Sequence, residues 1–144
     1  MFKKILVPTD GSELAAQAAL RAVTLAKMSG ASLMVLYVQG VYPYTGLGDG
    51  TAFGMQAYVT AGLAQGQQAI ERIASAAKAE GVVIEQLVIE NDQVANGIVE
   101  AAQTAGADLI AMGSHGRSGL AKLMLGSVAA KVLALSPVPV LIFK

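Results

Sequence analysis

Five short runs rich in Val, Ile and Leu recur along this chain of 144 residues, and longer segments with helical spacing separate them. Runs of this length and composition are typical of strands that are buried on both faces of a sheet. They are Lys4–Val7, Ser32–Val38, Val82–Ile89, Asp108–Met112 and Val138–Phe143. Since strands that alternate with helices form parallel sheets, we predict an α/β fold with helices on both faces of a five-stranded sheet.

The four intervening segments each carry apolar residues at helical spacing. The first helix is predicted to begin after Ser12, which can cap it, and to end at Gly30. Its predicted inward positions are Leu14, Ala18, Ala22 and Leu25. The other helices are predicted over Gln56–Ala79, from Asn91-Asp92 to Gly106, and from Ser127 to the residue before Pro137, the last with Val128, Val132 and Leu135 inward.

The expected strand order is 3-2-1-4-5, with right-handed crossovers. In such sheets, ligands bind beyond the carboxyl ends of the strands where the winding direction reverses, which is between the first and fourth strands here. That rule indicates two loops, Pro8–Ser12 and Gly113–Gly119, as the binding region. The length is about that of one domain, so residues 1–144 are expected to form a single domain.

Composition excludes several functional classes. With 10 Lys+Arg and 10 Asp+Glu the net charge is zero, so no global field attracts nucleic acid or an anionic membrane. The absence of cysteine excludes disulfides and a thiol nucleophile, and it fits a reducing cytoplasm. The apolar runs are shorter than the roughly 20 residues that span a bilayer, and the first is too short for a signal peptide. We therefore expect a cytoplasmic protein.

One long segment, Tyr42–Gly54, has four glycines, a proline and aromatic residues but no periodicity. It could form a lid over the site or a mobile surface connection, and the second interpretation is favoured. Within it, Gly46-Leu47-Gly48-Asp49-Gly50 resembles a dinucleotide-binding motif only superficially, because no strand end or helix start brackets it.

The segment Gly113–Val128 carries the strongest functional signal. Glycines let a backbone approach phosphate oxygens closely, and here they lie at positions 113, 116 and 119 after a predicted central strand. Gly126-Ser127 then opens the fourth helix, whose free N–H groups and dipole favour an anion. Arg117 adds a positive charge. The alternative is a simple turn in which Ser127 is an ordinary N-cap, and Ser127 could serve either role.

This combination resembles the universal stress protein family, in its ATP-binding type, over the whole length. The family motif Gly-x2-Gly-x9-Gly-[Ser/Thr] is matched by Gly113, Gly116, Gly126 and Ser127, and both ILVPTDGS and PVPVLIF are family-like. The resemblance implies a Rossmann-like fold of the adenine nucleotide alpha hydrolase-like kind. It also implies a nucleotide-dependent regulatory protein that binds ATP, often with Mg²⁺ or Mn²⁺ bridging the phosphates.

The resemblance further implies which residues surround the nucleotide. Pro8, Thr9 and Asp10 would border the adenosine, with Val38 against the base and Met112 and Gly113 beside the ribose. The phosphates would be held by Ser114, His115, Gly116, Arg117, Ser118, Gly119, Gly126, Ser127, Val128 and Ala129. Asp10 has an alternative role, because it could simply form an Asx turn over Gly11-Ser12.

The sequence gives weaker support for a catalytic function. His115 is the only histidine, so a zinc site is disfavoured, and no GxSxG elbow supports a Ser-His-Asp hydrolase. We interpret it as a phosphate-facing or neighbouring group. A slow ATPase or phosphate-transferring enzyme would need Asp10, Asp49 or Asp92 to position water or metal. A nucleotide-free interaction module is the remaining alternative, and the intact glycine motif disfavours it.

The last predicted strand is a candidate site for dimer formation. Val138–Phe143 is expected at an edge of the sheet, where unpaired backbone groups invite a partner, and Pro139 limits pairing on one side. Family resemblance adds that such proteins dimerise through this strand. We therefore predict a two-fold homodimer.

Overall fold

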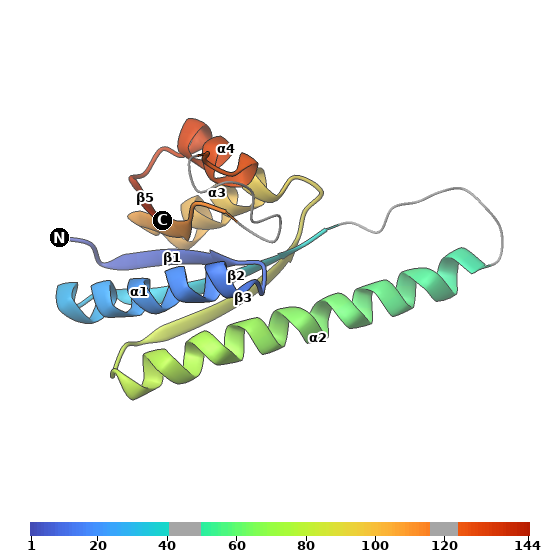
Figure 1. Cartoon of the computed structure of the whole chain (residues 1–144), viewed down its shortest axis with the longest axis horizontal. Coiled ribbons are helices and arrows are strands. Elements are labelled where there is room, and N and C mark those ends of the chain that lie inside the picture. Colours follow the sequence, from blue (N-terminus) through green and yellow to red (C-terminus); the bar gives the residue numbers. More distant parts are fainter. Residues whose placement is uncertain (41–49, 116–123) are drawn as a thin grey trace.

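The computed structural model describes residues 1–40, 50–115 and 124–144, with the side chains of 50–53 excepted. Strands and helices alternate along the chain, as the sequence predicts (Figure 1). The elements are β1 (Lys4–Thr9), α1 (Glu13–Ser29), β2 (Ser32–Gln39), α2 (Gly50–Ala79), β3 (Ile84–Glu90), α3 (Val94–Ala105), β4 (Leu109–Gly113), α4 (Ser127–Leu135) and β5 (Val140–Phe143).

The five strands form one parallel sheet in the order β3-β2-β1-β4-β5, which confirms the predicted topology. Strand β1 pairs with β2 along its whole length, from Lys4↔Ser32 to Thr9↔Tyr37. Its pairing with β4 is much shorter and comprises only Ile5↔Leu109 and Leu6↔Ile110. The carboxyl ends of β1 and β4 are therefore not joined by the ladder, and this is where the winding direction reverses.

Helices cover both faces of the sheet. Figure 1 shows α1 and α2 on one face and α3 and α4 on the other. Successive residues of β1 alternate between the two cores: Ile5 and Val7 pack with α1 and α2, and Leu6 packs with α3 and α4. Because all three side chains are fully buried, β1 is a central strand that is covered on both sides, as its unbroken aliphatic run predicts.

Helix α1 begins and ends where predicted. Ser12 caps it by accepting a hydrogen bond from the Ala15 N–H at 3.1 Å, and Gly30 ends it with a φ of 71°. The expected inward position of Leu14 is wrong, because this side chain is 48% exposed. The buried face of α1 consists of small residues, namely Ala15, Ala16, Ala18, Ala19, Ala22, Val23 and Ala26. Alanines bring the helix close to the sheet, and Leu14 lies at the border of that face.

Helix α2 begins at Gly50, six residues earlier than predicted, so Gly50–Gly54 is helical rather than irregular. The rest of the segment that we considered as a lid, residues 41–49, lies outside the described residues. Farther along, α2 approaches β2 so closely at Gly66 that a Cβ atom there would lie 2.6 Å from the Tyr37 ring. The N-terminal part of α2 extends well beyond the sheet (Figure 1).

The C-terminal elements differ from the prediction in two details. Strand β5 begins at Val140 rather than Val138, and Pro139 lies just before it, where its carbonyl accepts a hydrogen bond from the Ile110 N–H at 3.0 Å. In α4, Val132 is buried as expected, but Leu135, the last residue of this nine-residue helix, is 51% exposed. Within the described ranges, no helix combines the length and apolar character needed to cross a membrane.

Candidate functional site

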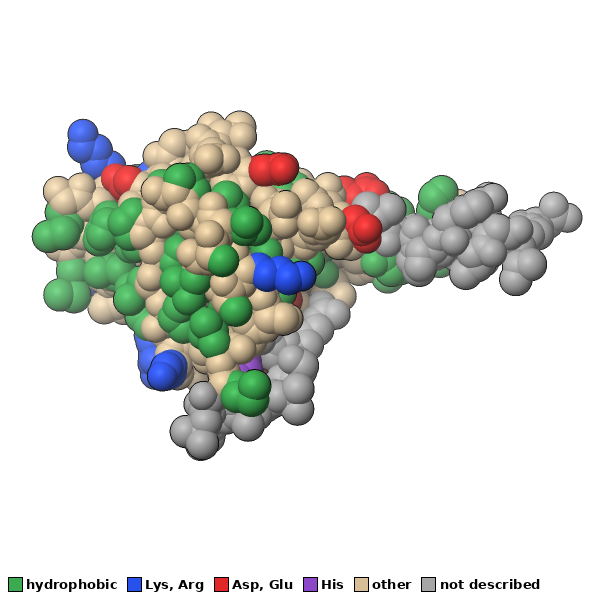
Figure 2. Space-filling view, turned by 90° about the horizontal axis from the view of Figure 1, so that it is seen from above, with side chains coloured by type: hydrophobic (Ala, Val, Ile, Leu, Met, Phe, Trp, Pro, Cys, Tyr) green, Lys and Arg blue, Asp and Glu red, His purple; other side chains and the backbone are tan. Residues whose placement is uncertain are grey.

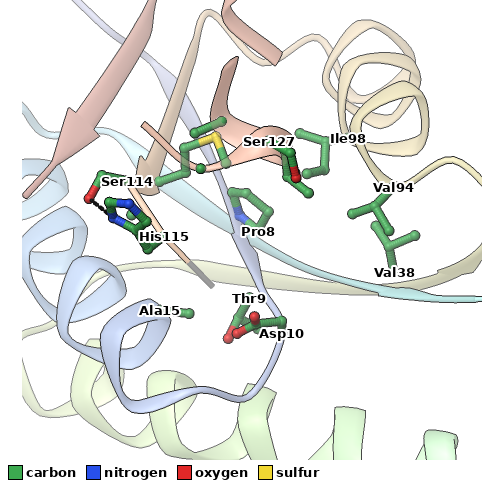
Figure 3. A pocket seen from close by; sticks show the side chains of 15 residues that line it. Pro8, Thr9, Asp10, Ala15, Val38, Val94, Ile98, Ser114, His115 and Ser127 are labelled. Carbon is green, nitrogen blue, oxygen red and sulfur yellow. Dashed lines mark hydrogen bonds between the residues drawn. The ribbon is translucent and has the colours of Figure 1, made fainter. Parts of the chain in front are cut away.

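A cavity of about 370 Å³ lies at the carboxyl ends of β1 and β4, at the predicted switch point (Figure 3). Twelve of its lining residues were predicted for the site: Pro8, Thr9, Asp10, Val38, Met112, Gly113, Ser114, His115, Gly126, Ser127, Val128 and Ala129. The other lining residues are Ala15, Val94 and Ile98. The remaining predicted residues, Gly116, Arg117, Ser118 and Gly119, lie outside the described part of the chain.

The turn after β1 forms one wall of this cavity. The Ser12 N–H donates to Asp10 Oδ1 at 2.9 Å, which is the Asx turn considered as the alternative role of Asp10. The Gly11 N–H donates to Thr9 Oγ1 at 3.2 Å, and Gly11 has a φ of 82°, which favours glycine. The turn therefore holds Asp10 at the cavity, so its structural role and a role in ligand binding are compatible.

The connection from β4 to α4 forms the opposite wall and is fixed by backbone hydrogen bonds. The Ser114 N–H donates to the Phe143 carbonyl at 3.0 Å, and the Ser114 carbonyl accepts from the Gly126 N–H at 2.7 Å. A Cβ atom on Gly126 would lie 2.7 Å from that same carbonyl oxygen. Since Gly126 has an ordinary φ of −62°, close packing rather than backbone conformation requires glycine here.

The N-terminus of α4 opens into the cavity. The N-cap is Gly126 and not Ser127, because Ser127 is the first residue of the helix and no side chain caps it. The Ala130 N–H is bonded back to the Gly126 carbonyl at 2.9 Å, so the N–H groups of Ser127, Val128 and Ala129 precede the first intrahelical bond. All three residues line the cavity. These N–H groups and the helix dipole create a positive potential at this end.

The two ends of the cavity differ in chemistry. Ser114 and His115 lie at one end of the cavity, Val38 and Val94 lie together at the other end, and Ser127 at the start of α4 lies beside Ile98 (Figure 3). Val94 and Ile98 were predicted as apolar positions of α3 but not as site residues. They are four residues apart and therefore lie on one face of α3. This face forms a cavity wall because α3 packs beside the end of β2, and the sequence alone does not show that packing.

Charged groups are sparse at this site. Among the described lining residues, Asp10 is the one charged side chain. Asp92 does not line the cavity, and Asp49 lies outside the described residues. In the described part of the chain, no group of three His, Cys, Asp or Glu side chains could hold a metal ion.

Among the described residues, the clearest charge interaction lies away from the cavity. Arg72 on α2 donates to both carboxylate oxygens of Glu13 on α1, at 2.8 and 3.0 Å. Hydrogen bonding and charge attraction lower the pKa of Glu13 and raise the pKa of Arg72. Because both side chains are exposed, this pair contributes to the α1–α2 contact only modestly. It does not line the cavity.

Comparison with known proteins identifies the family. The universal stress protein family matches residues 1–144. The chain belongs to this family. A universal stress protein of Methanocaldococcus jannaschii is 39% identical over 145 residues, which cover all of this chain and 83% of that protein. The family assignment thus confirms the resemblance that the glycine motif indicated.

Solved structures of the same family have the same fold. Universal stress protein UspA from Lactobacillus plantarum superposes with a TM-score of 0.87 at 22% identity, covering 99% of this chain and 97% of that one. A universal stress protein solved in complex with cAMP has a TM-score of 0.73 at 29% identity, again covering 99% and 97% of the two chains. The Rossmann-like architecture predicted from the sequence is therefore that of the family.

Proposed function

We propose that this universal stress protein binds ATP in the cavity between β1, β4 and α4 and acts as a nucleotide-dependent regulatory protein in the cytoplasm, folded as one domain of residues 1–144. The observation that carries the proposal is that the uncapped N-terminus of α4 opens into a cavity that also has an apolar end at Val38 and Val94. A phosphate group suits the N-terminus of α4, and a base suits the apolar end. The cAMP complex of a related protein supports an adenine nucleotide.

The proposed ligand position follows from these two ends. The adenine lies against Val38, Val94 and Ile98, and the ribose lies near Asp10 and Met112. The phosphates then extend toward Ser114 and the start of α4, where the N–H groups of Ser127, Val128 and Ala129 are available. An ATP molecule in this position uses the whole cavity, whereas adenosine uses only its apolar part and the ribose region.

We propose that a divalent cation binds at this site only together with the nucleotide. Among the described residues, the cavity offers the Asp10 carboxylate and the Ser127 hydroxyl as side-chain oxygens for Mg²⁺ or Mn²⁺, besides the hydroxyls of Thr9 and Ser114. Mg²⁺ usually keeps several waters and binds through one or two carboxylates and substrate phosphates. The ion is therefore expected to bind with ATP and not to the protein alone.

Equilibrium titration with ATP, ADP and AMP, each with and without Mg²⁺, tests the proposed function. Single-turnover hydrolysis of bound ATP then distinguishes a regulatory protein from a slow ATPase. Of the three Asp residues considered for catalysis, Asp10 is the one that is described and lines the cavity. If no nucleotide binds, the remaining alternative is a protein-interaction module that needs no nucleotide. Turnover that disappears when Asp10 is replaced would favour the enzyme.

Two replacements of Asp10 separate its turn from its contact with the ligand. Asn keeps an oxygen that can accept from the Ser12 N–H, whereas Ala removes it. We expect Asp10→Asn to change the free energy of unfolding by less than about 0.5 kcal/mol and Asp10→Ala to lower it by about 1 kcal/mol. Both should weaken ATP binding by about tenfold, since one ribose hydrogen bond to a charged group is weakened or lost.

Denaturant unfolding and calorimetric titration of both variants measure the two effects. If the Asn variant binds ATP as tightly as the wild type, Asp10 stabilises the turn and does not contact the ligand.

We also propose a two-fold homodimer that forms through Val138–Phe143. Strand β5 lies at one edge of the sheet, and Leu141 is 36% exposed. The neighbouring helix α4 exposes Leu133 and Leu135. Figure 2 shows hydrophobic side chains gathered on the face of the molecule that is seen from above. An exposed strand edge beside apolar side chains is a frequent site of association.

Light scattering at micromolar concentration is expected to give twice the mass of the chain, 29.4 kDa from 14.7 kDa. Leu141→Lys should shift the protein toward the monomer, because the charge would be desolvated between two β5 strands. Val83→Lys is the matched control, because Val83 is 69% exposed and precedes β3 at the opposite edge. A monomeric wild type would contradict the dimer.

A further inference from the structure

The edge of the sheet opposite β5 is formed by β3, which pairs with β2 alone among the described strands (Figure 1). The Val83 carbonyl accepts a hydrogen bond from the Leu33 N–H of β2 at 2.8 Å. Because the hydrogen-bonding groups of successive residues point to opposite sides of a strand, odd-numbered residues of β3 face β2. The outward-facing N–H and C=O groups are therefore those of Ile84, Gln86 and Val88.

A groove of about 560 Å³ lies between this edge and α2, with Val83 and Gln86 on the β3 side. Its α2 wall consists of residues spaced by three and four positions, which places them on one face of the helix. They are Glu71, Ala74, Ser75 and Lys78. The adjoining face of α2, with Ile70, Ile73 and Ala77, is buried in the core. The groove wall is thus a second face of α2 that lies along the free edge.

The charges on this wall are complementary to a second copy of the same wall. Glu71 and Lys78 are separated by two helical turns, about 10.5 Å along the axis, and the small side chains of Ala74 and Ser75 lie midway between them. An antiparallel copy of α2 that is centred on Ala74 and Ser75 brings its Lys78 opposite Glu71 and its Glu71 opposite Lys78. Neither side chain forms an ion pair within the described ranges, where Glu71 accepts from the neutral Gln67 amide at 3.2 Å.

The same two-fold axis allows the two free strand edges to pair. An axis beside Gln86 makes the two β3 strands antiparallel and gives pairs in which no acidic side chain faces another one. The facing pairs are Gln86 with Gln86, Ile84 with Val88, Glu85 with Leu87 and Val83 with Ile89.

The spacing of the helices fits this pairing. Helix α2 contacts both β2 and β3, and neighbouring strands are about 4.8 Å apart. A helix centred over these two strands is then two strand spacings, about 10 Å, from its copy, which is within the usual range for packed helices. Strand pairing and helix packing can therefore occur in one contact.

We propose that β3 and the groove wall of α2 bind a second copy of this chain across a two-fold axis, with reciprocal ion pairs between Glu71 and Lys78. The contact is separate from the nucleotide cavity and from β5. Exposed ion pairs contribute little to affinity, so this contact is weaker than the one through β5 and is not populated at micromolar concentration. With a two-fold contact at each edge of the sheet, dimers join into tetramers and longer assemblies.

Sedimentation equilibrium of Leu141→Lys isolates this contact, because that substitution acts on the contact through β5. We expect this parent variant to be monomeric at micromolar concentration and to dimerise with a dissociation constant below about 1 mM. Adding Lys78→Glu should weaken the dimer about 10-fold or more, since two attractive pairs become repulsive. Glu71→Lys should have the same effect. The exchange of both charges restores both pairs, so its dissociation constant should return to within about threefold of the parent value.

Lys131→Glu is the matched control for charge, because Lys131 is exposed on α4 and does not line the groove. It makes the same charge change and should alter the dissociation constant less than about twofold. Gln86→Pro tests the strand pairing. It removes an outward N–H that the β2–β3 ladder does not use, and edge strands tolerate proline at such positions. The dimer should weaken about 10-fold or more. Circular dichroism and thermal unfolding check that each variant is folded.

A Leu141→Lys variant that stays monomeric at about 1 mM would overturn the proposal. Equal dissociation constants for Lys78→Glu and its parent would also contradict it, as would a double exchange that does not recover the affinity lost in the single variants. If Gln86→Pro does not fold, the charge variants on the exposed face of α2 decide. If the wild type is itself monomeric at micromolar concentration, the contact through β5 is wrong, and the wild type replaces Leu141→Lys as the parent. ATP binding does not enter any of these measurements.

Discussion

Replacement of Ser127 by Asp is expected to lower the affinity for ATP by at least about 100-fold without destabilising the protein. Ser127 is the first residue of α4, and it lines the cavity. A carboxylate at a helix N-terminus interacts favourably with the dipole, by about 0.3–1 kcal/mol. The same carboxylate repels a phosphate about 4 Å away by about 4 kcal/mol at an effective dielectric constant near 20. Binding and stability should therefore change in opposite directions.

Gln93→Asp is the matched control for this charge. Gln93 is the exposed N-cap of α3, makes no side-chain capping hydrogen bond and does not line the cavity. The substitution adds the same charge at a helix N-terminus, so stability should rise similarly while ATP affinity stays within about threefold. Isothermal titration and thermal unfolding measure both properties. An affinity of Ser127→Asp within tenfold of the wild type would contradict phosphate binding at α4.

Replacement of Gly126 by Ala is expected to lower the free energy of unfolding by about 1–3 kcal/mol, as inserted methyl groups in tightly packed sites do. The added Cβ would lie 2.7 Å from the Ser114 carbonyl oxygen, which is a backbone atom fixed by its own neighbours. The hydrogen bond between the Gly126 N–H and that oxygen must lengthen or break. The start of α4 would move away from Ser114 and change the shape of the cavity, so ATP binding should weaken as well.

Gly113→Ala provides the comparison for stability. A Cβ atom at Gly113 would have the His115 carbonyl oxygen as its nearest neighbour at 3.5 Å, which is an ordinary contact. Neither glycine has a positive φ, so the two variants differ in packing and not in backbone strain. Urea denaturation should show less than about 0.5 kcal/mol of change for Gly113→Ala. Equal destabilisation of the two variants would contradict the packing argument.

Gly126→Ala and Ser127→Asp do not test the anion site equally well. Glycine spacing in the sequence indicates a phosphate loop, and replacing Gly126 is the obvious test of it. The structure shows that Gly126 already uses its N–H for Ser114 and leaves no room for a side chain. Loss of binding in Gly126→Ala can therefore result from displacement of α4. Ser127→Asp leaves the packing intact, so it tests the anion site more directly.

Much of the fold could be predicted because local signals agreed with the tertiary structure. Ser12 and Gly30 delimit α1 through a side-chain cap and a left-handed backbone conformation, both of which depend on the residue type itself. The inward positions of Leu14 and Leu135 could not be predicted from hydrophobicity. Alanine packs α1 against the sheet more closely than leucine can, and only the helix position on the sheet shows which face is buried.

The candidate site was predictable wherever chain geometry alone places residues together. The carboxyl ends of β1 and β4 meet at the switch point, so Pro8 and Gly113 were both expected there. Val94 and Ile98 were missed because their exposure to the cavity depends on how α3 packs beside β2. The burial of His115 Nε2, which has no hydrogen-bond partner among the described residues, could not be predicted from the sequence either, because it depends on the surrounding atoms.

A titration of the nitrogen-15-labelled protein with ATP, followed through its backbone amide signals, tests the central claim most directly. If ATP binds as proposed, the largest shifts occur at the N–H groups of Ser127, Val128 and Ala129, with further shifts at Thr9 and Asp10. The groove between α2 and β3, lined by Ser75, Lys78 and Val83 among others, should not respond. Unmoved signals of Ser127, Val128 and Ala129 at saturating ATP, or shifts confined to another surface, would contradict the account.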